Sequence, residues 1–124
     1  MAEEFFTRPL LRVRDVAASV AYYCEKVGCT LRWQHGTPPI IAEVERSGLN
    51  VILDSASVVP KPPGSSVLTL SVRPQALGDL HRELAGRGAR IASAPAPVPW
   101  QEGTYQLVVE DLDGNLLVFW GESA

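Results

Sequence analysis

The strongest constraint on the fold is an order of elements that occurs twice along the chain. Each half opens with a strand pattern, at residues 9–14 and 67–72, and a helical pattern follows each strand. Three further strand patterns come after each helix. Strand side chains alternate between two faces, whereas the apolar residues of a helix recur every three or four positions, so the two patterns can be distinguished. The repetition predicts an α+β domain of two βαβββ modules, each with its helix on one face of its sheet.

Local signals mark the ends of the two helices. Asp15 stands where a helix over residues 16–27 needs a capping side chain, and Gly28 follows that helix as a C-terminal glycine. In the second half, Pro74 opens a helix and Gly88 ends it.

The remaining segments divide the chain into modules. Module one covers about residues 5–58, a proline-rich linker covers 59–66, and module two covers about 67–121 of a single domain, 1–124. Residues 94–103 hold three prolines and are predicted to form a long loop. The remaining strands are predicted at residues 30–34, 40–46, 49–55, 89–92, 104–110 and 116–120.

Composition and charge exclude several classes of partner. The net charge of −3 gives no basic surface for nucleic acid. No apolar run approaches the roughly 20 residues that a membrane span needs. The acidic N-terminus lacks the basic region of a signal peptide, so a cytoplasmic location is expected. Cys24 and Cys29 do not have the spacing of a zinc pair, and we expect free thiols, the second buried.

The alternation of the strands also predicts what the face without a helix carries. A mixture of apolar and polar side chains with an exposed tryptophan suits a ligand cleft or a subunit interface better than a closed core. The side chains predicted on this helix-free face are Arg8, Leu10, Arg12, Val67, Thr69, Ser71, Leu116, Val118 and Trp120.

The motifs in both halves resemble a known superfamily. Residues 9–23 and 26–29 look like the opening of the glyoxalase/bleomycin-resistance/extradiol-dioxygenase (vicinal oxygen chelate) proteins. Residues 67–72, 80–84 and the Asp-Gly-Asn turn at 113–115 resemble the matching motifs of its second half. The resemblance implies a U-shaped mixed sheet around a cleft, helices on the outer face, and a homodimer with clefts at or near the subunit interface.

The same resemblance implies four metal-ligand positions at the bottom of the cleft. By position they fall on Arg8, Leu53, Val67 and Val118. An arginine has no lone pair to offer, and leucine and valine have no donor atom. The sequence therefore predicts no metal, no cofactor and no catalytic residue. Arg8 has two open interpretations: a salt bridge to a surface carboxylate, or a fixed cation that faces an anionic or carbonyl-bearing ligand.

These departures resemble the bleomycin-resistance branch, whose members bind an antibiotic without altering it. Aromatic side chains at a cleft can stack on flat rings, although tryptophans in sheets also serve cores and interfaces, and His35 also fits a surface histidine. Phe5 and Phe6 precede the first strand and could pack over a partner subunit. The expected ligand-binding residues are Trp100, Trp120, Trp33, His35, Arg8, Leu53, Val67, Thr69, Tyr105 and Val118.

The function predicted from the sequence is metal-free binding and sequestration of a small aromatic or amphipathic, antibiotic-like molecule, as in drug resistance. The alternative is a metal-dependent or cofactor-free lyase, isomerase or dioxygenase of the glyoxalase type. Neither a nucleophile elbow nor a nucleotide-binding glycine motif occurs in the chain, so a binding protein is favoured over an enzyme.

Overall fold

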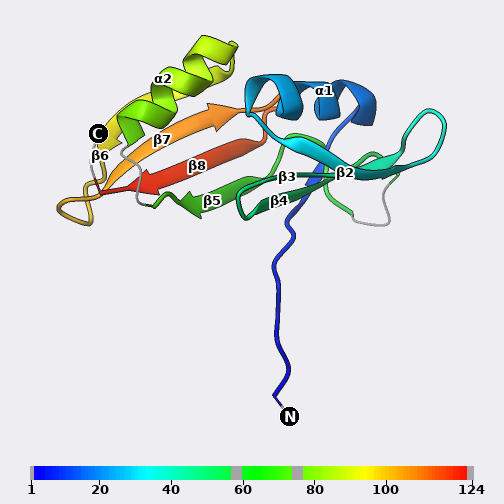
Figure 1. Ribbon diagram of the computed structural model, residues 1–124, viewed down its shortest axis with the longest axis horizontal. Coiled ribbons are helices and arrows are strands. Elements are labelled where there is room, and N and C mark those ends of the chain that lie inside the picture. The colour runs from blue at the N-terminus through cyan, green and yellow to red at the C-terminus, as the bar shows by residue number, and fades with distance from the viewer. Residues whose placement is uncertain (1, 57–59, 74–76, 123–124) are drawn as a thin grey trace.

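The computed structural model describes residues 2–56, 60–73 and 77–122. Within these ranges the chain forms two helices and two four-stranded sheets (Figure 1). The first module contains β1 (Leu10–Arg12), α1 (Val16–Lys26), β2 (Thr30–His35), β3 (Ile41–Arg46) and β4 (Leu49–Asp54). The second contains β5 (Val67–Ser71), α2 (Leu77–Arg87), β6 (Arg90–Pro97), β7 (Tyr105–Glu110) and β8 (Leu116–Gly121).

The two sheets have the same topology. Their strand orders are β1-β4-β3-β2 and β5-β8-β7-β6. In each sheet the first and last strands of the module pair in parallel, and the other pairs are antiparallel. The α+β class and the repeated βαβββ order are therefore confirmed. The strands of the described residues form two mixed sheets, each belonging to one module, and not one continuous sheet.

Both helices cover the same side of the sheets, and the opposite side carries no helix (Figure 1). The helix α1 packs on β2, β3 and β4, and α2 packs on β6, β7 and β8. Alternation along the strands follows the prediction, because Leu117 and Phe119 are buried in the core whereas Val67 and Thr69 are exposed on the helix-free face. The core therefore lies between helices and sheets.

The helix ends match their sequence signals where the structure describes them. The side chain of Asp15 accepts a hydrogen bond from the backbone N–H of Ala18, which otherwise has no partner at a helix start. Gly28 follows α1 with a φ of +82°, a conformation that side chains rarely adopt. The predicted opening of α2 at Pro74 lies outside the described residues. In the described residues both helices, at 11 residues each, fall short of the length and hydropathy of a membrane span.

The turn before β8 joins the two modules, and we call it the module joint (residues 110–115). Asp111 is buried and accepts hydrogen bonds from the Tyr23 hydroxyl and from the backbone and side-chain N–H groups of Asn115. The Asn115 amide also donates to the Arg12 carbonyl, and its oxygen accepts from the backbone N–H of Ser66. Side chains of this turn thus connect α1, β1 and the linker to the second sheet.

One predicted loop is partly a strand. Residues 94–103 were expected to be irregular, but β6 continues to Pro97 and pairs Ala96 with Gln106 and Pro97 with Tyr105. The prediction was wrong because β6 bonds only to β7 and forms the edge of its sheet. An edge strand tolerates proline, since its outward side needs no N–H donor.

A β-bulge in β2 changes which residues share a face. Leu31 pairs with Val44 and Trp33 pairs with Glu43, so Arg32 is an extra residue between them. Strict alternation would place Leu31 and Trp33 on the same side. The bulge instead turns Trp33 to the helix-free face, opposite the side of Val44.

The second module has the same irregularity at the matching step. In β6, Ile91 pairs with Val109 and Ser93 pairs with Val108, with Ala92 between them. Ser93 and Val108 thus hold the places that Trp33 and Glu43 hold in the first module. The two helix-free faces therefore have the same strand register, including the bulge, and differ in their side chains.

Both cysteines are free thiols, as predicted. Cys29 is buried, and burial raises the pKa of its thiol to about 12. Burial also raises the pKa of Cys24.

Candidate functional site

The helix-free face of the second module carries half of the predicted ligand-binding residues. Thr69 of β5 pairs with Val118 of β8, and Val118 pairs in turn with Val108 of β7. Val67, one alternate position before Thr69, leaves 63% of its surface exposed. This part of the face is therefore a small apolar and hydroxyl surface, open to solvent and fixed by the ladder of three strands.

Two tryptophans meet at the end of this face. The ring centroids of Trp100 and Trp120 lie 6.5 Å apart at an interplanar angle of 72°, an edge-to-face contact. The Trp120 indole N–H donates to the side-chain oxygen of Gln106 at 3.2 Å, which fixes the ring. Trp100 lies on the β6–β7 loop and leaves 67% of its surface exposed. A hollow of about 160 Å³, lined in part by Arg73 and Thr104, adjoins Trp120.

The first module's face holds a buried carboxylate. Glu43 is only 2% exposed, although it points away from the core residues Ala42 and Val44. One of its oxygens accepts from the Trp33 indole N–H at 2.9 Å, and the other accepts from the Asn50 amide at 2.9 Å. The bond from Asn50, followed by those from Trp33 and Arg8, holds the pKa of Glu43 below its usual value, although burial opposes the shift.

Arg8 completes this cluster from the chain before β1. Its guanidinium lies 3.3 Å from Glu43, while its own side chain remains 57% exposed. Of the two interpretations of Arg8, a salt bridge is therefore found, but with a buried carboxylate and not a surface one. A hollow of about 440 Å³ opens beside the pair, between Phe6, Arg32, Trp33 and Asn50.

Glu43 was not among the residues expected from the sequence. An acidic residue between Ala42 and Val44 in a strand is a signal of a polar position on the helix-free face. Its burial could not be foreseen, because the bulge at Arg32 brings Trp33 over it.

Two of the expected ligand-binding residues do not lie on the helix-free face. Leu53 is fully buried in the core on the helix side of β4, where Leu49 and Val51 also point, so the expectation that it lines the cleft was wrong by one position. Tyr105 packs against the core on the same side of β7 as Leu107, for the same reason of strand alternation.

The expected residues thus form two groups, one on each module. Trp33 and Arg8 lie together on the first module, with His35 exposed at the end of β2 on the face of Trp33. Trp100, Trp120, Thr69, Val118 and Val67 lie on the second module.

The four positions at which family enzymes hold a metal do not fit a metal ion here. Arg8 is a cation, Val67 and Val118 have no donor atom, and Leu53 lies in the core. The carboxylate of Glu43 stands beside Arg8, but hydrogen bonds from three side chains already occupy its oxygens. Across the parts of the chain that the structure describes, no group of three or more His, Cys, Asp or Glu side chains could hold a metal ion.

The geometry has a counterpart among known families. The model of the Glyoxalase/Bleomycin resistance protein/Dioxygenase superfamily matches residues 6–119, nearly the whole chain. The chain belongs to this superfamily. The resemblance seen in its motifs is thereby confirmed. No protein of curated function matches this superfamily member in sequence.

Several solved structures share the fold over nearly their whole length. TnmS3, an antibiotic binding protein from Streptomyces sp. CB03234, is 24% identical with a TM-score of 0.78, covering 99% of both chains. TioX from Micromonospora sp. ML1 is 19% identical, with a TM-score of 0.74 over 93% of this chain and 97% of its own. A superfamily member from Sphaerobacter thermophilus DSM 20745 is 20% identical, with a TM-score of 0.75 over 96% and 98%. Likenesses at these identities concern the fold.

Proposed function

We propose that this superfamily member binds and sequesters a small, flat or amphipathic molecule of antibiotic type without a metal ion. The observation that carries the proposal is the pair of Trp100 and Trp120 on the helix-free face, with Trp100 mostly exposed. An exposed indole held by a second, fixed indole offers a flat surface for an aromatic ring. TnmS3, which shares the fold, is described as an antibiotic binding protein, and this supports the same class of activity.

The surroundings of the two tryptophans suit an amphipathic ligand. Val67 and Val118 supply apolar contact, and the Thr69 hydroxyl supplies a donor and an acceptor. The side chains at the family's metal positions favour binding over metal-assisted chemistry, because they offer no open coordination site.

The proposal includes a homodimer in the cytoplasm. The chain before β1 extends away from the body below the helix-free face (Figure 1), and it carries Phe5 and Phe6, which are 86% and 88% exposed. Two adjacent exposed phenylalanines on an extended segment suit packing on a second copy of the chain. Such a partner would lie beside the helix-free face and border the ligand site.

A fluorescence titration tests the proposed site. The intrinsic tryptophan emission is followed while bleomycin, mitomycin C and an aromatic enediyne are added separately. We expect saturable quenching by at least one of them, and a loss of affinity of about tenfold in Trp100→Ala, since stacking contributes about 0.5–1.5 kcal/mol beyond the buried area. Trp33→Phe is the matched control, because it removes one indole from the first module and leaves the proposed site in the second module intact.

Two results would overturn the proposal. One is the absence of saturable quenching by all three compounds. The other is stoichiometric zinc, nickel, iron or manganese in the purified protein, which would favour the glyoxalase-type enzyme instead.

A further inference from the structure

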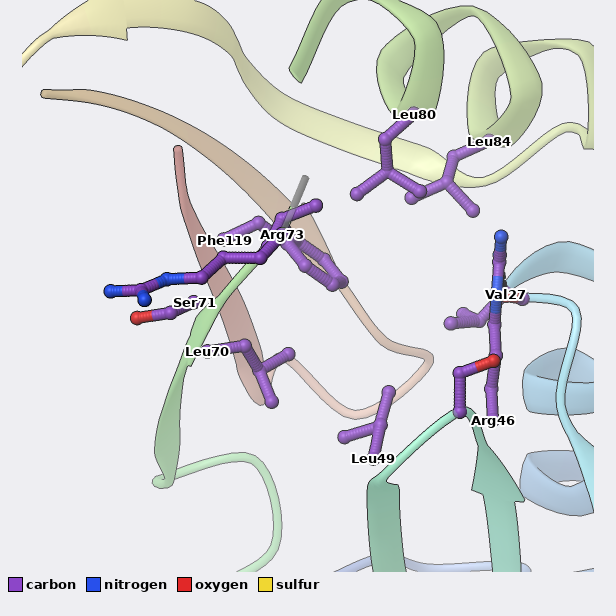
Figure 2. A pocket seen from close by; sticks show the side chains of 11 residues that line it. Val27, Arg46, Leu49, Leu70, Ser71, Arg73, Leu80, Leu84 and Phe119 are labelled. Carbon is purple, nitrogen blue, oxygen red and sulfur yellow. Dashed lines mark hydrogen bonds between the residues drawn. The ribbon is translucent and has the colours of Figure 1, made fainter. Parts of the chain in front are cut away.

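A cavity lies between the two modules on the side of the helices (Figure 2), and it shares Ser71, Val72 and Arg73 of its lining with the hollow beside Trp120. Its volume is about 270 Å³. In Figure 2 the side chains of Leu49, Leu80 and Leu84 point into one common space, whereas the side chains of Ser71 and Arg73 point away from it. The apolar side chains around the cavity are Val27, Leu49, Leu70, Val72, Leu80, Leu84 and Phe119.

The cavity is the counterpart of the module joint. The helices α1 and α2 have 11 residues each, and Tyr23 and Leu84 hold the same place in them. The preceding residues, Tyr22 and Glu83, each reach the last residue of a strand in the other module. The Tyr22 hydroxyl donates to the Glu110 carbonyl at 2.7 Å, and Glu83 pairs with Arg46 at 2.7 Å. The two contacts are one residue apart in the register of the repeat, because Thr30 pairs with Glu45 as Arg90 pairs with Glu110, which puts Arg46 in the place of Asp111.

The two sides differ at the next residue. At the module joint, the Tyr23 ring is fully buried and its hydroxyl donates to Asp111 at 2.9 Å. On the other side, Leu84 replaces the tyrosine and Arg46 stands in the place of Asp111. A leucine does not extend as far as a phenol, and the Arg46 guanidinium turns to Glu83 and to the Val27 carbonyl. The space that a tyrosine ring fills on one side therefore belongs to a cavity on the other.

The charges at the end of this cavity favour an anion. Glu83 accepts from Arg46 at 2.7 Å and from Arg87 at 2.9 Å, so one carboxylate faces two guanidinium groups. Arg46 also donates to the Val27 carbonyl at 2.8 Å, which fixes its position at the cavity wall. Ser47 lines the cavity beside it and offers a hydroxyl.

We propose that this cavity binds a small aromatic monocarboxylate. The ring would lie among Leu49, Leu80 and Leu84, as the Tyr23 ring lies at the module joint. The carboxylate would face Arg46 and Ser47. Two guanidinium groups and one carboxylate meet there, so a net positive charge attracts it. The cavity exceeds the roughly 150 Å³ that holds a benzene ring in an apolar interior, which leaves room for the carboxylate. The space among Leu49, Leu80 and Leu84 lies on the helix side of the sheets, whereas Trp120 alternates with the core residue Phe119 and lies on the helix-free side, so this proposal does not depend on the proposed function.

Methyl NMR of the intact protein with benzoate as the probe tests the proposal. We expect saturable shifts of the methyl signals of Val27, Leu80 and Leu84, while the indole N–H signals of Trp100 and Trp120 stay unchanged. Benzyl alcohol, which has the ring without the charge, should bind at least about tenfold more weakly. The indole signals report on the proposed drug site, so failure at one site is distinguished from failure at the other.

Substitutions distinguish the contribution of the apolar cavity to binding from that of the Arg46 guanidinium. Leu84→Tyr introduces the ring found at the module joint and should abolish the benzoate shifts, and Leu49→Phe serves if that variant does not fold. Arg46→Gln should weaken benzoate about tenfold and leave benzyl alcohol unaffected, whereas Arg82→Gln, on the outer surface of α2, should change neither. The absence of methyl shifts at about 10 mM benzoate, or equal binding of both probes, would overturn the proposal.

Discussion

Glu43 shows how one side chain organises the first module's face. Its carboxylate is removed from water and accepts hydrogen bonds from Arg8, Trp33 and Asn50. Because its pKa is lowered in the folded chain, the charged form stabilises the fold. That stabilisation is present above the pKa of an unfolded glutamate and is lost as the pH falls through the folded pKa.

We therefore expect Glu43→Gln to lower the free energy of unfolding by about 1–3 kcal/mol at neutral pH, since the amide cannot accept all three donors. The difference from the parent should shrink as the pH falls below about 4. Urea denaturation at a series of pH values measures it. Glu45→Gln, on the same strand and half exposed, is the control. A loss of unfolding free energy in Glu43→Gln that does not change with pH would contradict the explanation.

Tyr23 has the opposite dependence on pH. Burial, followed by the charge of Asp111, raises the pKa of its phenol well above the usual value. A raised pKa means that stability is present below the pKa of an unfolded tyrosine and is lost as the pH rises above it. We expect Tyr23→Phe to lower the free energy of unfolding by about 1 kcal/mol at neutral pH, because the hydrogen bond to Asp111 is lost. Above about pH 10, the free energy of unfolding of this variant should fall less steeply with pH than that of the parent. Urea denaturation at a series of alkaline pH values measures the effect, and Tyr105→Phe is the control for the loss of a tyrosine hydroxyl elsewhere.

At the scale of elements, the module joint depends on the close approach of two turns. Gly64 of the linker has a φ of +80°, and a Cβ there would lie 1.9 Å from the Asp113 carbonyl oxygen. Gly48, in the β3–β4 turn, also has a positive φ of +94°, but a Cβ there meets nothing within 4 Å. The two glycines differ in crowding and share a left-handed backbone conformation that a residue with a Cβ rarely adopts.

We expect Gly48→Ala to cost about 1 kcal/mol of stability, which is the strain of a left-handed conformation. Gly64→Ala should cost about 3 kcal/mol or more, because the backbone of the joint must also move. Thermal and urea unfolding of both variants gives the comparison. Equal losses in the two variants would mean that the contact between linker and joint contributes little.

The faces of strands could be predicted from the sequence where the ladder is regular. Alternation placed Val67, Thr69 and Val118 correctly, because β5 and β8 pair without interruption. It could not place Trp33, because an extra residue in β2 has no local signal that distinguishes it from an ordinary strand residue. The length of β6 was missed for a related reason: prolines normally end a strand, and only its place at a sheet edge allows them.

At the scale of the whole molecule, the proposed dimer can be tested at the extended N-terminal segment. Replacing Phe5 and Phe6 with serine removes two exposed aromatic rings without touching the core. If the segment packs on a partner, the dimer should weaken at least about tenfold, since burying one phenylalanine contributes about 1.5–3 kcal/mol. Analytical ultracentrifugation over a range of concentrations measures the change, with Leu112→Ser as the control for an exposed apolar residue elsewhere.

The candidate site was only partly visible in the sequence. Trp100 and Trp120 were expected on one surface and do meet, because the parity of Trp120 and the position of Trp100 after a proline are local properties. The Glu43 cluster depends on a bulge. The cavity beside Leu84 depends on a comparison between modules that needs coordinates, since nothing in a leucine indicates that its counterpart is a tyrosine.

The bulges at Arg32 and Ala92 also carry historical information. The same extra residue interrupts the same strand at the same step in both halves. One insertion inherited by two copies is a simpler history than two separate insertions, so the extra residue is older than the joining of the halves. In that history, a single βαβββ unit already turned the side chain after its bulge toward the helix-free face. Trp33 and Ser93 then diverged at a position whose side-chain direction both halves inherited.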